Sequence, residues 1–286
     1  MKKLSVRKSQ RLSNSQRNFI MIACGIAVVA FFCGILFSKI PKPKLPKKII
    51  PKEVITKPTL GVIALIIDDW GSGKSVIPFI STVNVPVAIA VLPKLPYSKT
   101  IAEYAHANNK EVMLHLPMEP HSTADIYPKD YIIKASMSPT KIKMLINEDL
   151  LTVPFAQGIN NHMGSKATES EKLIAIIYSY LKTKDFFFVD STTSEKSICE
   201  NIAKDLNIPF TKRDMFIDNK ADQVYIKNQI AELAQLAQKQ GSAVGIGHAR
   251  PLTLQVLKEE IPALKEKGFK FITVREMITY QKNNPR

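Results

Sequence analysis

The segment LIIDDWGSGKS, residues 65–75, joins the features that decide the fold. It opens with the apolar residues of a buried β-strand, continues into two adjacent carboxylates, and ends in a glycine-containing stretch. The last five residues look like the end of a phosphate-binding loop, which requires Gly-x-x-x-x-Gly-Lys-Ser. With Gly73 fixed, the first glycine would stand at position 68, where the chain has Asp68. A carboxylate there would repel phosphate, so we interpret the segment as a strand, a turn and the start of a helix, and we expect no nucleotide.

On both sides of this segment, short apolar runs alternate with longer amphipathic ones, which is typical of a parallel α/β domain. Several runs are apolar throughout, as expected of strands covered on both faces. Seven or eight such units in about 228 residues favour a (β/α) barrel, although the pattern alone does not exclude an open doubly wound sheet. We expect strands at 62–68, 86–92, 111–116, 156–160, 186–190, 210–216, 243–247 and 271–274. We expect helices at 98–108, 138–151, 169–182, 195–206, 223–239 and 252–267.

The N-terminal region has a different composition. Residues 19–37, FIMIACGIAVVAFFCGILF, carry no charge and are long enough to span a bilayer core of roughly 30 Å. No small-residue cleavage site follows, so we expect a retained membrane helix rather than a cleaved signal peptide. Residues 41–58 hold five prolines and six lysines, a composition typical of an extended spacer. We therefore expect a basic cytoplasmic tail at 1–18, a transmembrane anchor at 19–38, a spacer at 39–58 and one domain at 59–286.

Most of the net charge of +15 belongs to that N-terminal region. Thirteen of the 40 Lys and Arg residues lie in residues 1–57 beside one acid, Glu53, which leaves 27 basic and 24 acidic residues for the remainder. Composition therefore gives no sign of the basic face that nucleic-acid binding requires, and we expect no nucleic acid. Only Cys199 lies in the domain, which excludes an intradomain disulfide.

Polar residues gather where the predicted strands end. In a parallel barrel the carboxyl ends of the strands converge on one face, and the active site lies there. One Asp or His at such a position often only caps the next helix, but this coincidence extends over six strands. Imidazoles and carboxylates together are typical ligands of a divalent metal, with zinc the default and hydrolysis the leading reaction. The residues are Asp68, Asp69, His115, Asn160, Asn161, His162, Asp190, Ser191, Asp214, Asp218 and His248.

Six motifs occur in a characteristic order: IDDWG (67–71), KEVMLHLPMEP (110–120), INNHMGS (159–165), FFFVDSTT (186–193), RDMFIDN (213–219) and IGH (246–248). Over about residues 61–274 the chain resembles the divergent polysaccharide deacetylases of bacterial envelopes, relatives of metal-dependent carbohydrate deacetylases. The resemblance implies an irregular (β/α)7-type barrel, here preceded by one transmembrane helix. It also implies a hydrolase that removes N-acetyl or other acyl groups from an envelope glycan. The alternative is a catalytically inactive glycan-binding or scaffold protein, since fold does not fix function.

The resemblance also implies roles for individual residues. Asp68 would be the general base and His248 the acid that protonates the leaving amine. Asp190 matches an acidic position that orients catalytic groups in the family.

The metal ligands implied by the resemblance depart from the usual pattern at one position. Asp69 and His115 would be two ligands of a divalent metal, with zinc expected. The family usually takes two ligands from a His-x-x-x-His segment, whereas the residue four after His115 is Glu119. The third ligand is therefore Glu119 or, as we prefer, His162, because imidazole suits zinc and the fourth strand neighbours the third.

Four further residues are candidates for contact with the carbohydrate. The ring of Trp70 would stack on a sugar or lie buried in the core. Asn160 and Asn161 would donate to a substrate oxygen or satisfy a buried loop. Arg213 would form an internal ion pair with Asp214, or position the base in a glycan-facing cleft.

Charge alone does not orient the expected anchor, because six basic residues precede the span and seven follow it before the domain. Members of the resembling family act outside the inner membrane. The resemblance therefore implies a single-pass inner-membrane protein with its C-terminal domain in the periplasm.

Overall fold

The computed structural model describes residue 21 and residues 59–122 and 131–285. The expected basic tail, membrane anchor and spacer therefore lie outside the described residues, apart from Met21. No helix within those residues is both long and apolar enough to cross a membrane. The chain divides into units at 1–55 and 56–286, and the strands of the fold belong to the second unit.

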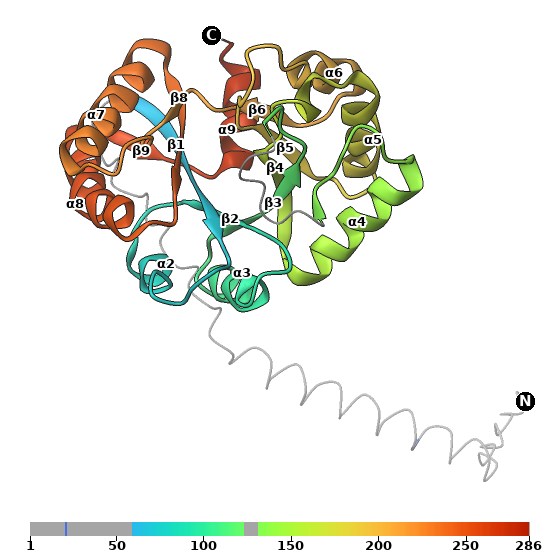
Figure 1. Ribbon diagram of the computed structural model, residues 1–286. Helices are drawn as coiled ribbons and strands as arrows, with labels where there is room; N and C mark the ends of the chain where they lie inside the picture. The colour runs from blue at the N-terminus through green and yellow to red at the C-terminus, as the bar shows by residue number, and fades with distance from the viewer. Residues whose placement is uncertain (1–20, 22–58, 123–130, 286) are drawn as a thin grey trace, which may run out of the picture. The chain divides into compact units, whose positions relative to one another are not determined.

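The described strands are all parallel and form one curled sheet, in the order β6-β5-β4-β3-β2-β1-β8-β7, with β9 paired to the start of β1 (Figure 1). The predicted parallel α/β arrangement is confirmed. The strands are β1 Gly61–Trp70, β2 Ala88–Val91, β3 Glu111–Met118, β4 Ala156–Met163, β5 Phe187–Asp190, β6 Phe210–Lys212, β7 Met215–Phe216, β8 Ser242–His248 and β9 Phe269–Phe271.

Two edges of this sheet are joined by one extended segment of chain. β6 pairs with β5 and β7 pairs with β8, while only Arg213 and Asp214 separate β6 from β7. The backbone N–H of Arg213 donates to Asp190 O at 2.9 Å, and that of Asp214 donates to Val244 O at 2.9 Å. Backbone hydrogen bonding thus passes from one edge to the other. The curled sheet is consistent with the predicted barrel, in which this segment was expected as a single strand.

Helices cover the outside of the sheet and connect its strands (Figure 1). Side-chain caps begin several of them, as when Ser138, Ser170 and Asp222 accept from backbone N–H groups of the first turn. Glycines in the left-handed region end the two longest, at Gly241 and Gly268. These elements are α2 Pro78–Thr82, α3 Ser98–Ala107, α4 Pro139–Thr152, the 3₁₀ helix η2 Ala167–Glu169, α5 Glu171–Lys182, α6 Cys199–Leu206, α7 Gln223–Gln240 and α8 Pro251–Lys267.

The last helix, α9 (Val274–Asn283), lies where the sequence predicted the end of a strand. The expected strand at 271–274 is wrong, because β9 ends at Phe271 and Thr273 caps α9. The Thr273 side chain accepts from the backbone of Glu276, whose carboxylate accepts in return from the Thr273 backbone, so the pair forms a capping box. This capping box begins α9 at Val274, three residues after the end of β9.

Helix α9 closes the amino end of the curled sheet. The buried carboxylate of Glu111, the first residue of β3, accepts from the backbone N–H groups of Val274 at 2.6 Å and Arg275 at 3.1 Å. Val274 and Met277 pack into a core formed inside the curl by alternate strand residues. Apolar side chains therefore fill the inside of the curl toward its amino end. The inner core comprises Val62, Ala64, Ile66, Ala88, Ala90, Met113, Phe187, Val189, Val244, Ile246, Ile272, Val274 and Met277.

Candidate metal and acid–base site

The alternation of side chains along the strands carries polar groups into the carboxyl end of the curl. Side chains in a strand point to opposite faces with a period of two. On β1 the inner series is Val62, Ala64 and Ile66, so Asp68 lies next in the same series. The same two-residue step along the other strands gives further inward-facing polar residues: His115 on β3, Asn160 and His162 on β4, and His248 on β8.

Asp69 joins this group because the strand is irregular at that residue. Regular alternation would turn its side chain away from Asp68. Asp69 instead has φ of 62°, and the pairing of β1 with β2 shifts register between Ile67 and Trp70. Asp is one of the residues that tolerates the left-handed region, and an irregularity of this kind re-aims a side chain. Two consecutive carboxylates therefore serve one site.

Asp69, His115 and His162 form a compact cluster of ligand-type atoms. Asp69 Oδ1 lies 3.2 Å from His115 Nε2 and 3.1 Å from His162 Nδ1, and the two imidazole nitrogens are 3.2 Å apart. Burial alone would raise the pKa of Asp69, but the two imidazoles outweigh burial and hold it well below its usual value. The carboxylate is therefore ionised throughout the neutral range.

This cluster fits a tetrahedral divalent metal. Two ligand atoms of a zinc ion are separated by about 3.3 Å at the usual zinc–nitrogen and zinc–oxygen distances. The three separations in the cluster are close to that value. Asp69 Oδ1 is buried and has no hydrogen bond of good geometry from any described residue. A buried carboxylate oxygen without a donor is costly unless a cation completes it, so the three residues make a possible metal-binding site.

Asp68 lies beside the cluster and has a different environment. It is 2% exposed, and its Oδ2 is 3.6 Å from His115 Nε2. Its Oδ1 accepts a hydrogen bond of 2.9 Å from Asn160 Nδ2. Burial raises the pKa of Asp68 and the neighbouring Asp69 adds to the effect, while His115 partly opposes it. A carboxylate with a raised pKa is a better proton acceptor than an ordinary one.

His248 is held by a carboxylate that the sequence did not assign to it. Its Nδ1 lies 2.8 Å from Asp218 Oδ1, and Asp218 Oδ2 accepts from the His248 backbone at 2.9 Å and from Thr253 Oγ1 at 2.7 Å. Burial would lower the pKa of His248, but the bond to Asp218 outweighs it and raises the pKa. Asp218 therefore favours the protonated form of the imidazole more than water would. Asp218 was visible in the RDMFIDN motif, but no spacing rule linked it to His248.

Asp190 does not face the same way as these residues. Phe187 and Val189 belong to the inner core, so Asp190 is out of phase with them. Its oxygens accept from Thr192 N at 2.8 Å and Ser197 Oγ at 2.6 Å, which fixes the turn after β5. Burial raises the pKa of Asp190. Asp218, rather than Asp190, is the carboxylate that contacts His248.

Glu119, the alternative third ligand, is engaged elsewhere. Its carboxylate lies 2.8 Å from Lys166 Nζ and accepts from Ala135 N at 3.1 Å. It is not part of the cluster that contains Asp69. The geometry therefore favours His162 as the third ligand.

The two asparagines are both used inside the protein. Asn160 is completely buried and bonds both His115 and Asp68. Asn161 accepts from Ser191 N at 2.8 Å and donates to Met163 O at 2.8 Å, which satisfies the loop after β4. Both Asn160 and Asn161 therefore make internal hydrogen bonds, which is the second of the two alternatives expected from the sequence.

Arg213 is half-buried and bonds the turn after β5. Its guanidinium donates to the carbonyl oxygens of Ser191 at 2.7 Å and Thr192 at 2.8 Å. It also lies over the ring of Phe216, 3.8 Å from the centroid, and Phe216 stacks on His248. Arg213 therefore belongs to the wall of the site beside His248, where its charge acts on Asp68 and Asp190.

Trp70 takes the second of its two expected positions. It is 1% exposed and packs in the larger apolar core outside the curl. The left-handed residue before it turns the ring away from the site, so Trp70 is not placed to stack on a sugar. The sequence could not show this, because the alternation breaks at Asp69.

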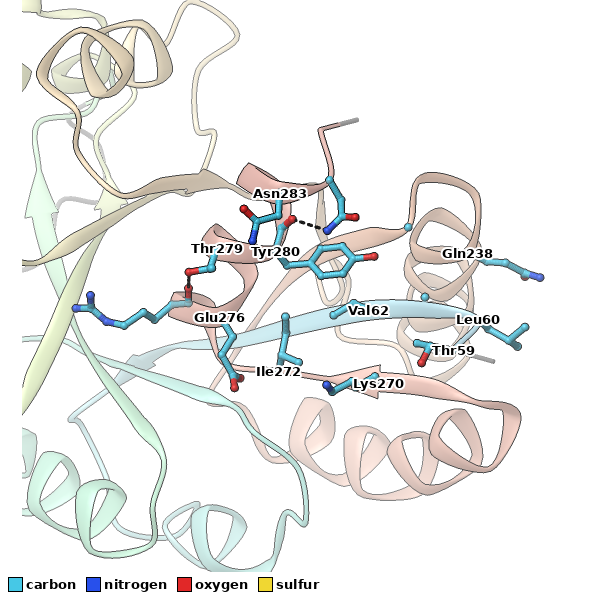
Figure 2. Close-up of a pocket in the computed structure, with 14 residues that line it drawn as sticks. Thr59, Leu60, Val62, Gln238, Lys270, Ile272, Glu276, Thr279, Tyr280 and Asn283 are labelled. Carbon is cyan, nitrogen blue, oxygen red and sulfur yellow. Dashed lines mark hydrogen bonds between the residues drawn. The ribbon is translucent and has the colours of Figure 1, made fainter. Parts of the chain in front are cut away.

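A separate groove of about 700 Å³ lies at the amino end of the sheet (Figure 2). The starts of β1 and β9, the end of α7 and the side of α9 supply its lining, which includes Leu60, Lys270 and Tyr280. Its one acidic residue is Glu276, whose carboxylate already caps α9. The lining offers no imidazole, so this groove is not the predicted metal site.

Together, the curled parallel sheet and the residues at its carboxyl end define a polysaccharide deacetylase-like α/β domain. The chain belongs to the divergent polysaccharide deacetylase family, whose model matches residues 65–278. The resemblance noted in the motifs is thus confirmed.

Three individual proteins are similar to this chain in sequence or fold. The chain is 31% identical over 204 residues to an uncharacterized protein of Haemophilus influenzae, covering 71% of this chain and 72% of that protein. It is 31% identical over 201 residues to the uncharacterized protein YibQ of Escherichia coli, covering 70% of this chain but 62% of YibQ. A crystal structure of an uncharacterized protein from Agrobacterium tumefaciens has the same fold, with a TM-score of 0.71 at 16% identity over 76% of this chain and 89% of that chain.

Proposed function

We propose that the protein is a membrane-anchored, metal-dependent hydrolase that removes N-acetyl or other acyl groups from a glycan of the cell envelope. The observation that carries this proposal is the position of three groups at one end of the sheet. The Asp69–His115–His162 cluster, the buried carboxylate of Asp68 and the Asp218-bound imidazole of His248 lie together at the carboxyl end of the curled sheet. Metal-dependent hydrolysis of an amide uses these three parts, namely a Lewis acid, a base and an acid.

Each side chain has a definite part in the proposed reaction. A zinc ion held by the cluster would supply Lewis acidity to the scissile carbonyl and to water. Asp68 would take the proton from the attacking water, because its Oδ2 lies beside the cluster, 3.6 Å from His115 Nε2. His248 would give a proton to the leaving amine, because Asp218 orients its imidazole and favours the protonated form. Proton transfer of this kind typically contributes about 10²–10⁴-fold to a rate.

The test is release of acetate from N-acetylated oligosaccharides by the purified full chain loaded with Zn²⁺. We expect Asp68→Asn to retain bound zinc and lose at least about 100-fold in kcat, since it removes the base and keeps the shape. Asp69→Ala is expected to lose both zinc and activity. A wild-type chain that binds zinc but releases no acyl group from any glycan would overturn the hydrolase and leave the alternative, a non-catalytic glycan-binding or scaffold protein.

The envelope location is part of the same proposal. The uncharged run at 19–37 and the Lys/Pro-rich spacer that follows it support an inner-membrane anchor with the domain in the periplasm. A C-terminal alkaline phosphatase fusion should be active and a C-terminal green fluorescent protein fusion dark. The opposite pattern would place the domain in the cytoplasm and exclude an envelope glycan as substrate.

A further inference from the structure

One buried amide connects the cluster to the neighbouring carboxylate. Asn160 has no solvent exposure, and it lies directly opposite His115 in the pairing of β3 with β4. Asn160 Oδ1 is 2.9 Å from His115 Nδ1, and Asn160 Nδ2 is 2.9 Å from Asp68 Oδ1. The same side chain therefore contacts a residue of the cluster with one end and the carboxylate beside it with the other.

The polarity of these two bonds follows from their partners. An ionised carboxylate only accepts hydrogen bonds, so the amide must present its NH₂ group to Asp68 and its carbonyl oxygen to His115. The carbonyl oxygen also only accepts, so His115 must carry a proton on Nδ1. Neutral His115 then has its lone pair on Nε2, the atom that lies 3.2 Å from Asp69 Oδ1 within the cluster.

We propose that Asn160 is a positioning residue that selects the metal-binding tautomer of His115 and, through the other end of the same amide, aims the carboxylate of Asp68. The Asp68 half of this inference rests on the proposed function, whereas the His115 half requires only metal binding. Partners of this kind around ligating histidines change metal affinity by about 10–100-fold when removed.

The neighbouring Asn161 shows what a purely structural asparagine looks like in the same strand. Its amide bonds the backbone of Ser191 and Met163 and no member of the cluster. Asn160 makes one weak additional contact, from Nδ2 to Ser191 Oγ at 3.4 Å. Removal of that hydroxyl leaves both functional bonds of Asn160 in place, so Ser191→Ala is a matched control.

Two variants separate the two ends of the amide. Asn160→Leu keeps the branched arrangement of the side-chain heavy atoms but has neither a donor nor an acceptor, so both bonds are lost. Asn160→Asp keeps an oxygen to accept from His115 Nδ1 but replaces the NH₂ donor that faces Asp68. If the inference holds, the first variant impairs metal binding and the second spares it while disturbing Asp68.

The experiment measures Zn²⁺ affinity of the purified full chain by calorimetry, together with the ¹⁵N shifts of the labelled histidines in the zinc-loaded chain. We expect zinc affinity to fall about 10–100-fold in Asn160→Leu and to stay within about threefold of wild type in Asn160→Asp and Ser191→Ala. The ¹⁵N shifts should report the Nδ1–H tautomer of His115 in the wild type and a mixture in Asn160→Leu. Acyl release should fall at least about 10-fold in Asn160→Asp, with zinc bound.

Failure of the inference differs from failure of the proposed function. A folded Asn160→Leu chain with wild-type zinc affinity and an unchanged His115 tautomer would overturn the inference, whatever the activity. If Asn160→Leu instead does not fold, wild-type acyl release by zinc-loaded Asn160→Asp would overturn the aiming of Asp68. Weak zinc binding by Asn160→Leu, together with a wild-type chain that binds zinc but hydrolyses nothing, would support the tautomer assignment and remove the hydrolase.

Discussion

Asp69 is the residue on which the arrangement of the site depends most. Its φ of 62° places a residue with a side chain in a region that costs L-amino acids about 1–2 kcal/mol, although Asp tolerates it better than most. Because of this conformation, its carboxylate contacts His115 and His162 instead of pointing away from the inside of the curl, as regular alternation along β1 would require. Backbone strain of this kind is concentrated at functional sites.

Substitution at this residue should separate backbone strain from metal binding. Asp69→Gly adopts the left-handed region freely, whereas Asp69→Ala has a side chain with no local hydrogen bond to compensate. Without metal, we expect urea denaturation to show Asp69→Ala less stable than Asp69→Gly by about 1 kcal/mol. Neither variant should bind zinc. Equal stabilities would mean that the backbone relaxes out of the left-handed region when the carboxylate is removed.

The third ligand can be assigned with two single substitutions. His162→Ala removes a nitrogen that lies 3.1 Å from Asp69 Oδ1, so bound zinc per chain should drop far below one when measured by atomic emission. Glu119→Gln is the matched control, because Glu119 is bonded to Lys166 and Ala135 and should leave the zinc content unchanged. The reverse result would assign Glu119, through a rearrangement of its loop on metal binding.

At the scale of elements, apolar runs and helical periodicity predicted most of the strands and all but the shortest and last helices. Strands covered on both faces are apolar at nearly every position, so the pattern marked them well but did not show which face was inner. That is why Asp190 was grouped with the site although it is out of phase with Val189. Alternation along a strand also does not predict the left-handed turn at Asp69, so the sequence left Trp70 either beside a sugar or buried in the core.

Helix α4 carries a buried carboxylate that is unrelated to the site. Asp149 has no solvent exposure, and neither of its oxygens has a hydrogen bond of good geometry from the described residues. Lys94, in the turn after β2, lies 3.2 Å from Asp149 and 2.9 Å from Glu148. Burial raises the pKa of Asp149 to about 6, and Lys94 offsets this only partly.

This carboxylate should make stability depend on pH. Because the folded pKa of about 6 exceeds the usual aspartate pKa of 3.8, the folded state binds the proton more tightly. Stability from this group is therefore full below pH 4 and is lost as pH rises through 6. Asp149→Asn should raise the free energy of unfolding by about 1–3 kcal/mol at pH 8, and by less at pH 5. Urea denaturation at both values checks this, with the exposed Glu148→Gln as control; an equal gain at both would contradict the assignment.

At the scale of the whole domain, the two ends of the curled sheet differ in composition, since one is apolar and the other carries the candidate site. Helix α9 fills the amino end through Val274 and Met277, whereas the carboxyl end carries Asp68, His115 and His248. The sequence indicated the carboxyl-end residues because they lie near the ends of predicted strands. It did not indicate which of them touch, since contacts such as His248 with Asp218 depend on how the sheet curls.

Metal binding should be linked to the stability of this domain, because the cluster draws its ligands from β1, β3 and β4, which come together only in the folded state. Zinc at 100 times its dissociation constant would add about 2.7 kcal/mol, or about 5–10 °C in Tm for a domain of this size. We expect a chelator to remove that increment from the wild type in a thermal scan. Asp69→Gly should melt at the same temperature with and without zinc. A zinc-induced rise in Tm of the same size in Asp69→Gly would place the stabilising metal at another site and leave the cluster without a thermodynamic role.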